Sequence, residues 1–126
     1  MTKLILYHYS NEQFNGYIRP SFFGKNGFTS YSQNLCNIKR SYFYINIYER
    51  EYFFSGARYR YITDIDEKKL YNIDEDRLKI VNNKTQTDIY RYLIKKGYRG
   101  IIGTNGYKIV ILFNKIKIKS QVNLTK

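Results

Sequence analysis

The sequence predicts an α+β fold, in which a mostly antiparallel β-sheet is accompanied by a few short helices. Two apolar runs, Leu4–Tyr9 and Tyr107–Phe113, are typical of buried strands. The Asn105-Gly106 pair before the second run favours a tight hairpin turn. Asp88–Lys96 has apolar residues at helical spacing and is followed by Gly97, which predicts a helix and its end. The 126 residues suit a single domain that spans residues 1-126.

The region between these elements contains further β signals. Strict alternation over Ala57–Ile65 predicts a strand with tyrosines on one face and Arg58 and Arg60 on the other. Ser10–Gln13 has the spacing of a capping box, so a short helix is expected to begin there. The other expected elements are short strands at Phe28–Tyr31, within Asn37–Ile47 and at Leu70–Ile73, a turn at Asp66–Lys69 and an edge strand at Lys115–Lys119.

Composition excludes several classes of protein. Hydrophobic residues make up 43% and aromatic residues 18%, so the chain can form an ordered core. Cys36 is the only cysteine, which rules out an intrachain disulfide or a cysteine-based zinc site and favours a structural thiol in a reducing compartment. No apolar run approaches the roughly 20 residues of a membrane span, and no signal-peptide pattern is present. A cytoplasmic location is therefore expected.

The chain is strongly basic, with a formal net charge of +12. Such a charge favours anionic partners, including nucleic acid, nucleotide phosphates or an acidic protein. An alternative is compositional drift, because Ile, Asn, Lys and Tyr are all heavily used and all have A/T-rich codons. The sequence leaves both explanations open.

His8 is the only histidine and lies at the end of the first apolar run. Its side chain has an unperturbed pKa near neutrality, so it can donate or accept a hydrogen bond in a site. We expect His8 to line a cleft, with Tyr42 or Tyr44 in reach. The alternative is a half-buried histidine in a small core.

The order of short motifs along nearly the whole chain resembles that of a known superfamily. The motifs are Leu6-Tyr7-His8-Tyr9-Ser10, Gly27-Phe28-Thr29-Ser30-Tyr31, Arg40-Ser41-Tyr42-Phe43-Tyr44, Tyr61–Asp66, Leu70-Tyr71-Asn72-Ile73, Lys96–Ile102 and Val110–Asn114. In these the chain resembles the ADP-ribosyltransferase superfamily, in its small histidine–tyrosine branch. The first motif is similar to the family's His-x-Ser/Thr strand.

The resemblance implies an ADP-ribosyltransferase-like split β-sheet that clasps NAD, the substrate, in a central cleft. His8 would bond a ribose, Ser10 would hold the nicotinamide amide, and Tyr42 or Tyr44 would stack on the nicotinamide ring. Tyr9, in the same first motif, is included among the NAD-binding residues, and His8 and Tyr44 are the expected catalytic residues.

The two arginines of the alternating strand are further candidates for this site. At their spacing, Arg58 and Arg60 could grip two phosphates, so either is expected to neutralise the NAD pyrophosphate. An exposed strand face is the alternative reading of the pair.

The function implied is an NAD-dependent mono-ADP-ribosyltransferase that modifies a protein or nucleic-acid target, as in bacterial toxins and phage proteins, with the host cytoplasm as its place if the chain is phage-encoded. The family usually has a carboxylate before its penultimate strand, whereas residues 105–108 here are Asn, Gly, Tyr and Lys. Glu51 or Asp64 could supply one instead. The alternative is a catalytically inactive relative that binds a nucleotide, a nucleic acid or a host protein.

Overall fold

The computed structural model describes residues 2–21, 38–45, 57–81, 85–105 and 107–124. Its elements are β1 (Lys3–Ser10), β2 (Tyr17–Ile18), β3 (Ser41–Tyr44), β4 (Tyr59–Asp66), the 3-10 helix η1 (Glu67–Lys69), β5 (Leu70–Asn72), α3 (Gln86–Lys95), β6 (Gly100–Asn105), β7 (Tyr107–Leu112), β8 (Ile116–Lys117) and β9 (Ser120–Asn123). The expected mixed fold, mostly a many-stranded sheet with one α-helix in the described residues, is confirmed.

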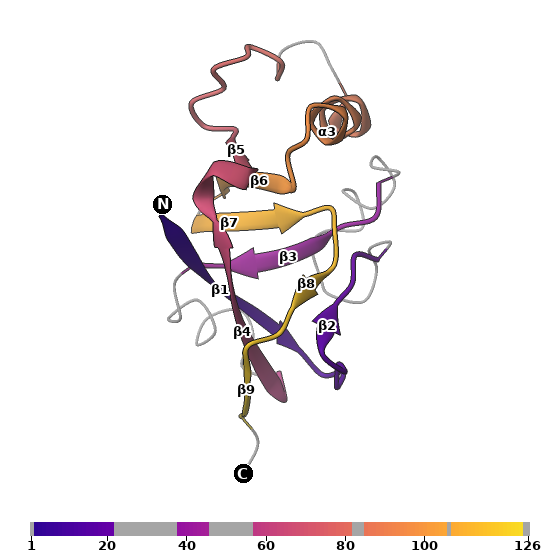
Figure 1. The fold of residues 1–126 in the computed structure, drawn as a ribbon, viewed down its shortest axis with the longest axis vertical. Helices are drawn as coiled ribbons and strands as arrows, with labels where there is room; N and C mark the ends of the chain where they lie inside the picture. Colours follow the sequence, from indigo (N-terminus) through magenta and orange to yellow (C-terminus); the bar gives the residue numbers. More distant parts are fainter. Residues whose placement is uncertain (1, 22–37, 46–56, 82–84, 106, 125–126) are drawn as a thin grey trace.

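The main sheet has seven strands in the order β5-β6-β7-β3-β1-β4-β9. Every pairing in it is antiparallel except that of β5 with β6. The two apolar runs of the sequence form β1 and β7, which lie on either side of β3 (Figure 1). The expectation that both lie in one mostly antiparallel sheet is therefore confirmed.

The sheet divides into two halves where β1 meets β3. Among the described residues, Tyr7 and Tyr44 are the one pair across this junction, whereas β1 and β4 pair along their whole length. In Figure 1, β3 and β7 cross the view while β4 and β9 run along its long axis, with β1 oblique between them. The strands on the two sides of the β1–β3 junction thus run in different directions, and we call this junction the split.

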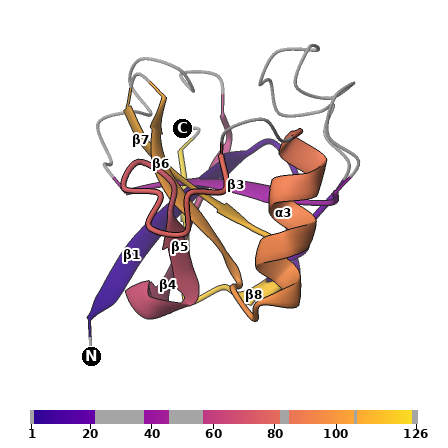
Figure 2. The ribbon, with the colours of Figure 1, turned by 90° about the horizontal axis from the view of Figure 1, so that it is seen from above.

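Each face of the sheet is covered by a different layer. The helix α3 packs its buried Ile89, Tyr90 and Leu93 on one face, which we call the helix face (Figure 2). The opposite face, the ribbon face, is covered by the two-stranded β2–β8 ribbon through Ile18 and Ile116. Both layers bury apolar side chains, and this burial supplies most of the free energy that holds them on the sheet.

Two sequence-based expectations are wrong or only partly correct, and a third is not tested. Residues 11–16 form an irregular turn rather than a helix, because Asn11 Oδ1 accepts from the Arg58 backbone N–H and the Phe14 N–H donates to the Tyr61 hydroxyl, both on the neighbouring β4 side. Of the expected strand Lys115–Lys119, only Ile116–Lys117 pairs, and it pairs with β2 while β9 forms the sheet edge. The strand expected at Phe28–Tyr31 lies outside the described residues.

Candidate functional site

The predicted site residues divide between the two faces of the sheet. Successive side chains of a strand alternate in direction, so His8 and Ser10 share the ribbon face with Phe43 and Tyr61. The side chains of Tyr9 and Tyr44 belong to the helix face. The structure therefore does not bring the His8 imidazole together with the rings of the tyrosines that were expected to complete its site.

The imidazole of His8 lies at the split and is enclosed by aromatic rings. Its ring centroid is 5.2 Å from that of Phe43, 5.8 Å from that of Phe14 and 6.5 Å from that of Tyr61. The residue is only 5% exposed, so the expectation that it lines an open cleft is wrong. The Phe14 ring, from the turn that follows β1, covers the imidazole.

One hydrogen bond determines which nitrogen of the neutral imidazole carries the proton. His8 Nδ1 lies 2.6 Å from the backbone carbonyl oxygen of Tyr42 and must donate to it, because a carbonyl only accepts. Burial lowers the pKa of His8, although this hydrogen bond and the Glu12 charge oppose the effect. In the neutral ring the proton is thus on Nδ1, and Nε2 presents a bare lone pair.

The lone pair of His8 Nε2 is buried and has no hydrogen-bond partner in the described part of the chain. A second such atom, the hydroxyl oxygen of Ser41, lies on β3 and shares the ribbon face with Phe43. A buried polar atom without a hydrogen bond costs about 1–3 kcal/mol of folding free energy, and the ribbon face bears this cost at two positions. Sequence reasoning did not single out Ser41; its spacing of two from Phe43 was the available signal.

The turn at residues 11–14 covers the His8 side of the split. The Tyr61 hydroxyl donates to the Glu12 carbonyl oxygen at 2.7 Å and accepts from the Phe14 backbone N–H at 3.0 Å. Ser10 Oγ accepts from the Glu12 N–H at 3.0 Å, so the Ser10 hydroxyl holds this turn. Access to His8 requires displacement of Phe14, and the Tyr61 hydroxyl is the anchor that resists it.

The tyrosines proposed for ring stacking have other contacts on the helix face. Tyr9 and Tyr44 are each 3% exposed, and their ring centroids lie 6.1 Å apart. The Tyr42 hydroxyl accepts from Arg40 Nε at 2.8 Å, and Arg40 is itself 2% exposed. These rings form part of the core beneath α3 rather than a surface beside the imidazole.

The two arginines proposed for the pyrophosphate differ in position. Arg60 pairs with Tyr9 and so points to the helix face, where its Nε is buried and unpartnered among the described residues. Arg58 is exposed, and its backbone N–H donates to Asn11 Oδ1 just beyond the end of β1. Of the two arginines, only Arg58 is exposed near the end of β1 that carries Ser10.

Of the carboxylates considered, Glu51 lies outside the described residues. Asp64 forms ion pairs with Lys119 at 2.7 Å and Lys3 at 3.8 Å, and a hydrogen bond from Lys119 lowers its pKa. The Asp64 carboxylate is therefore held by these two ion pairs. Glu12, in the turn over His8, is the carboxylate whose charge acts on the imidazole.

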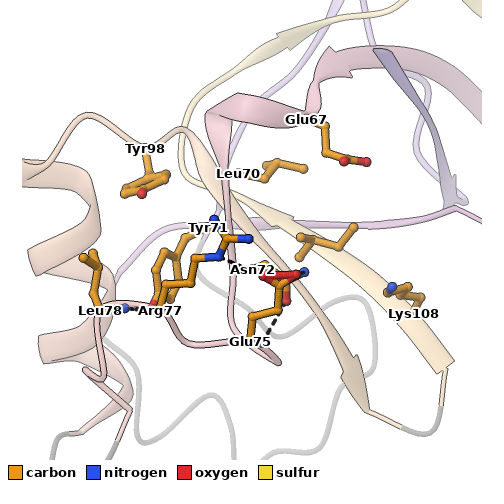
Figure 3. Close-up of a pocket in the computed structure, with 10 residues that line it drawn as sticks. Glu67, Leu70, Tyr71, Asn72, Glu75, Arg77, Leu78, Tyr98 and Lys108 are labelled. Carbon is orange, nitrogen blue, oxygen red and sulfur yellow. Dashed lines mark hydrogen bonds and ion pairs between the residues drawn. The ribbon is translucent and has the colours of Figure 1, made fainter. Parts of the chain in front are cut away.

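A separate pocket of about 490 Å³ opens beside β5 (Figure 3). Leu70, Asn72 and Ile102 contribute strand residues to its wall, and Tyr98 and Lys108 lie on opposite sides of it. The remaining lining residues are Glu67, Tyr71, Glu75, Arg77 and Leu78. Acidic and basic side chains occur in similar number, so the pocket has no clear preference for a charged ligand.

The turn that borders this pocket is held by a buried hydroxyl. Tyr71 donates to Asp76 and accepts from the Leu78 backbone N–H at 3.0 Å. Burial, followed by the hydrogen bond to Asp76, raises the pKa of Tyr71 to about 12, whereas the same bond lowers the pKa of Asp76. The carboxylate also accepts from the Ile80 and Val81 N–H groups, so this network is a structural brace.

No family model, curated protein or solved structure matches the chain. Within the described ranges, no helix is long and apolar enough to cross a membrane, and no group of three or more His, Cys, Asp or Glu residues could hold a metal ion. Only the geometry of the candidate site therefore bears on its function.

Proposed function

We propose that this chain is an NAD-binding domain of the ADP-ribosyltransferase type, with its ligand held at the split on the ribbon face. The observation that carries the proposal is the buried, unpartnered lone pair of His8 Nε2. A ribose hydroxyl is a donor that such an acceptor would bind. The division of the sheet at the Tyr7–Tyr44 pair supports the split-sheet architecture that the sequence resemblance implies.

The proposed contacts differ from those expected from the sequence. His8 and Ser10 remain on the ligand side, and Ser41 joins them because its hydroxyl is also buried without a partner in the described residues. Phe14 or Tyr61 replaces Tyr42 and Tyr44 as the ring for stacking, since both lie beside the imidazole.

Arg58 is the proposed phosphate contact. It is exposed and lies at the end of β1, on the side of the turn that covers His8. Arg60 does not take this role, because its register with Tyr9 directs its side chain to the helix face.

Transfer of ADP-ribose would also require a carboxylate to stabilise the positive charge that develops on the ribose. We assign this role to Glu12, which is exposed in the turn over His8 and whose charge reaches the imidazole. The catalytic form of the proposal is then a mono-ADP-ribosyltransferase that uses NAD as its substrate.

A second candidate function is a non-catalytic relative that binds its ligand without cleaving it. The chemistry of the strands around His8 favours this second function. The described residues of β1, β3 and β4 that face the ribbon side include no carboxylate that could stabilise a reacting ribose. Glu12 comes from a turn and not from a strand, so its position depends on hydrogen bonds to Tyr61 and Ser10.

Calorimetric titration with NAD tests the binding proposal. His8→Asn keeps an N–H near the Tyr42 carbonyl and removes the Nε2 acceptor, so it should weaken binding by about 5- to 150-fold. Tyr9→Phe, on the helix face, is the matched control and should bind like the unmodified chain. No binding of millimolar NAD by the unmodified chain would refute the proposal.

Incubation with labelled NAD and a cell lysate separates the two candidate functions. A transferase should label a target, and Glu12→Gln should abolish labelling while NAD affinity stays within about twofold. Binding of NAD without any labelling would establish the non-catalytic relative instead.

A further inference from the structure

A strip of cations surrounds one exposed tyrosine on the outer side of the β2–β8 ribbon. Tyr17 and Lys117 face each other in the register of the ribbon and point outward, since their neighbours Ile18 and Ile116 are buried. Lys115 Nζ lies 4.7 Å and the Arg19 guanidinium carbon 5.8 Å from the centre of the Tyr17 ring.

Arg99 extends this arrangement, because its guanidinium donates to the Lys115 carbonyl oxygen at 3.3 Å. We call Tyr17, Arg19, Arg99, Lys115 and Lys117 the ribbon strip. Figure 1 shows β2 and β8 side by side, to one side of the main sheet. These contacts connect all five residues into one continuous surface.

No carboxylate in the described part of the chain neutralises the cations of the ribbon strip. None of the four forms an ion pair with an acidic side chain of the described residues, whereas nearby Lys119 pairs with Asp64. Arg19, Lys115 and Lys117 are also exposed. Unpaired cations on an exposed surface attract anions from solution.

The charge of the chain is also unevenly distributed. All 10 acidic residues lie at or before Asp88, whereas basic residues continue to Lys126. Compositional drift towards A/T-rich codons would act along the whole gene and would not remove acidic residues from one part alone. The asymmetry therefore favours a binding role for the basic surface that β8 helps to form.

We infer that the ribbon strip binds single-stranded nucleic acid. Its four cations would contact successive phosphates, and the ring of Tyr17, a residue that is 37% exposed, would stack on a base. Single-stranded nucleic acid would use both features of the strip together, because its phosphates pair with the cations and its bases stack on the ring. The inference does not depend on NAD binding, because the strip is on the outer side of the ribbon, away from His8.

Fluorescence anisotropy with a labelled oligothymidylate, in the absence of NAD, tests this inference. Lys115→Ala/Lys117→Ala should reduce the slope of log affinity against log salt by about 1.4 and weaken binding roughly 10- to 30-fold near 0.1 M salt. Tyr17→Ala should weaken it roughly 5- to 150-fold, and Tyr17→Phe should restore most of the loss.

Matched controls separate the strip from net charge. Lys68→Ala/Lys69→Ala removes the same charge from exposed positions on η1 and should change affinity by less than about twofold. His8→Asn should leave oligothymidylate binding unchanged, so failure of the NAD proposal and failure of this one are distinguishable.

Three results would overturn the inference. One is an equal loss of affinity in the η1 double variant, which would indicate a diffuse charge effect. The second is equal binding of a duplex of the same length with no effect of Tyr17→Ala. The third is preferential binding to vesicles that contain phosphatidylserine, which would assign the strip to a membrane surface.

Discussion

The His8 imidazole and the Tyr42 backbone join the two halves of the sheet across its split. Nδ1 lies 2.6 Å from the Tyr42 carbonyl oxygen, at a point beyond the Tyr7–Tyr44 pair that joins β1 and β3 in the described residues. A side chain thus takes the place of a strand-to-strand bond. This contact leaves Nε2 as an acceptor on the ribbon face, and the NAD proposal follows from it.

The first prediction concerns acid stability. Because burial lowers the pKa of His8, the unfolded chain takes up a proton near pH 6.5 while the folded chain does not. The free energy of unfolding should therefore fall as pH decreases below about 6.5, down to the lowered pKa of the folded state. Urea denaturation at a series of pH values measures it.

His8 is the only histidine, so a single variant isolates its contribution. In His8→Asn the pH dependence should disappear above the range in which the carboxylates titrate. NMR of the imidazole nitrogens should show the Nδ1–H form at neutral pH. A stability that increases on acidification through this range would contradict the assigned state.

The second prediction compares two adjacent residues of α3. Leu93 is fully buried on the side of α3 that faces the sheet, whereas Ile94 is 42% exposed. Leu93→Ala should lower the free energy of unfolding by about 2–5 kcal/mol, because it leaves a cavity against the sheet. Ile94→Ala should change it by no more than about 0.5 kcal/mol. Similar losses in both variants would show that α3 does not pack in this orientation.

The third prediction concerns the brace beside the β5 pocket. Tyr71→Phe removes the donor to Asp76 and the acceptor for the Leu78 N–H, so it should cost about 1–3 kcal/mol. Tyr98→Phe is the control, since the Tyr98 ring packs against Tyr71 at 5.4 Å between centroids but its hydroxyl forms no hydrogen bond within the described residues. Thermal unfolding of the two variants compares them directly.

The same tyrosine predicts a difference at high pH. Its pKa of about 12 exceeds the ordinary value of 10.0, so the unfolded chain loses the Tyr71 proton first and stability falls as pH rises between these values. Tyr71→Phe should lose less stability over this interval than the unmodified chain. An equal loss in both would mean that Tyr71 titrates normally.

The fourth prediction concerns Gly100, at the start of β6. A Cβ there would lie 2.1 Å from the Ile111 carbonyl oxygen and 2.8 Å from Leu112 Cδ2. Gly100→Ala should therefore destabilise the chain by about 1–3 kcal/mol or more, through displacement of β7. Ser120→Ala, at an exposed position of the edge strand β9, should lie within about 0.5 kcal/mol of the unmodified chain. Denaturant titration of both variants provides the test.

The local pattern of the sequence determined most of the secondary structure. The apolar runs at β1 and β7, the alternation along β4 and the helical spacing before Gly97 each depend on neighbours a few residues apart. The same alternation correctly separates Tyr61 from Arg60 on opposite faces. Such periodicity is a property of the chain itself, so it can be read without the fold.

Only the tertiary structure decided which residues meet around His8. The register of β1 against β3, and the hydrogen bonds that draw residues 11–14 onto Tyr61, join segments about 35 to 50 positions apart. These long-range contacts place Phe14 over the imidazole and put Ser41 on the same face of the sheet. They also direct the Tyr42 and Tyr44 rings to the opposite face. No local pattern records a pairing between distant strands, because its free energy arises only when both are in place.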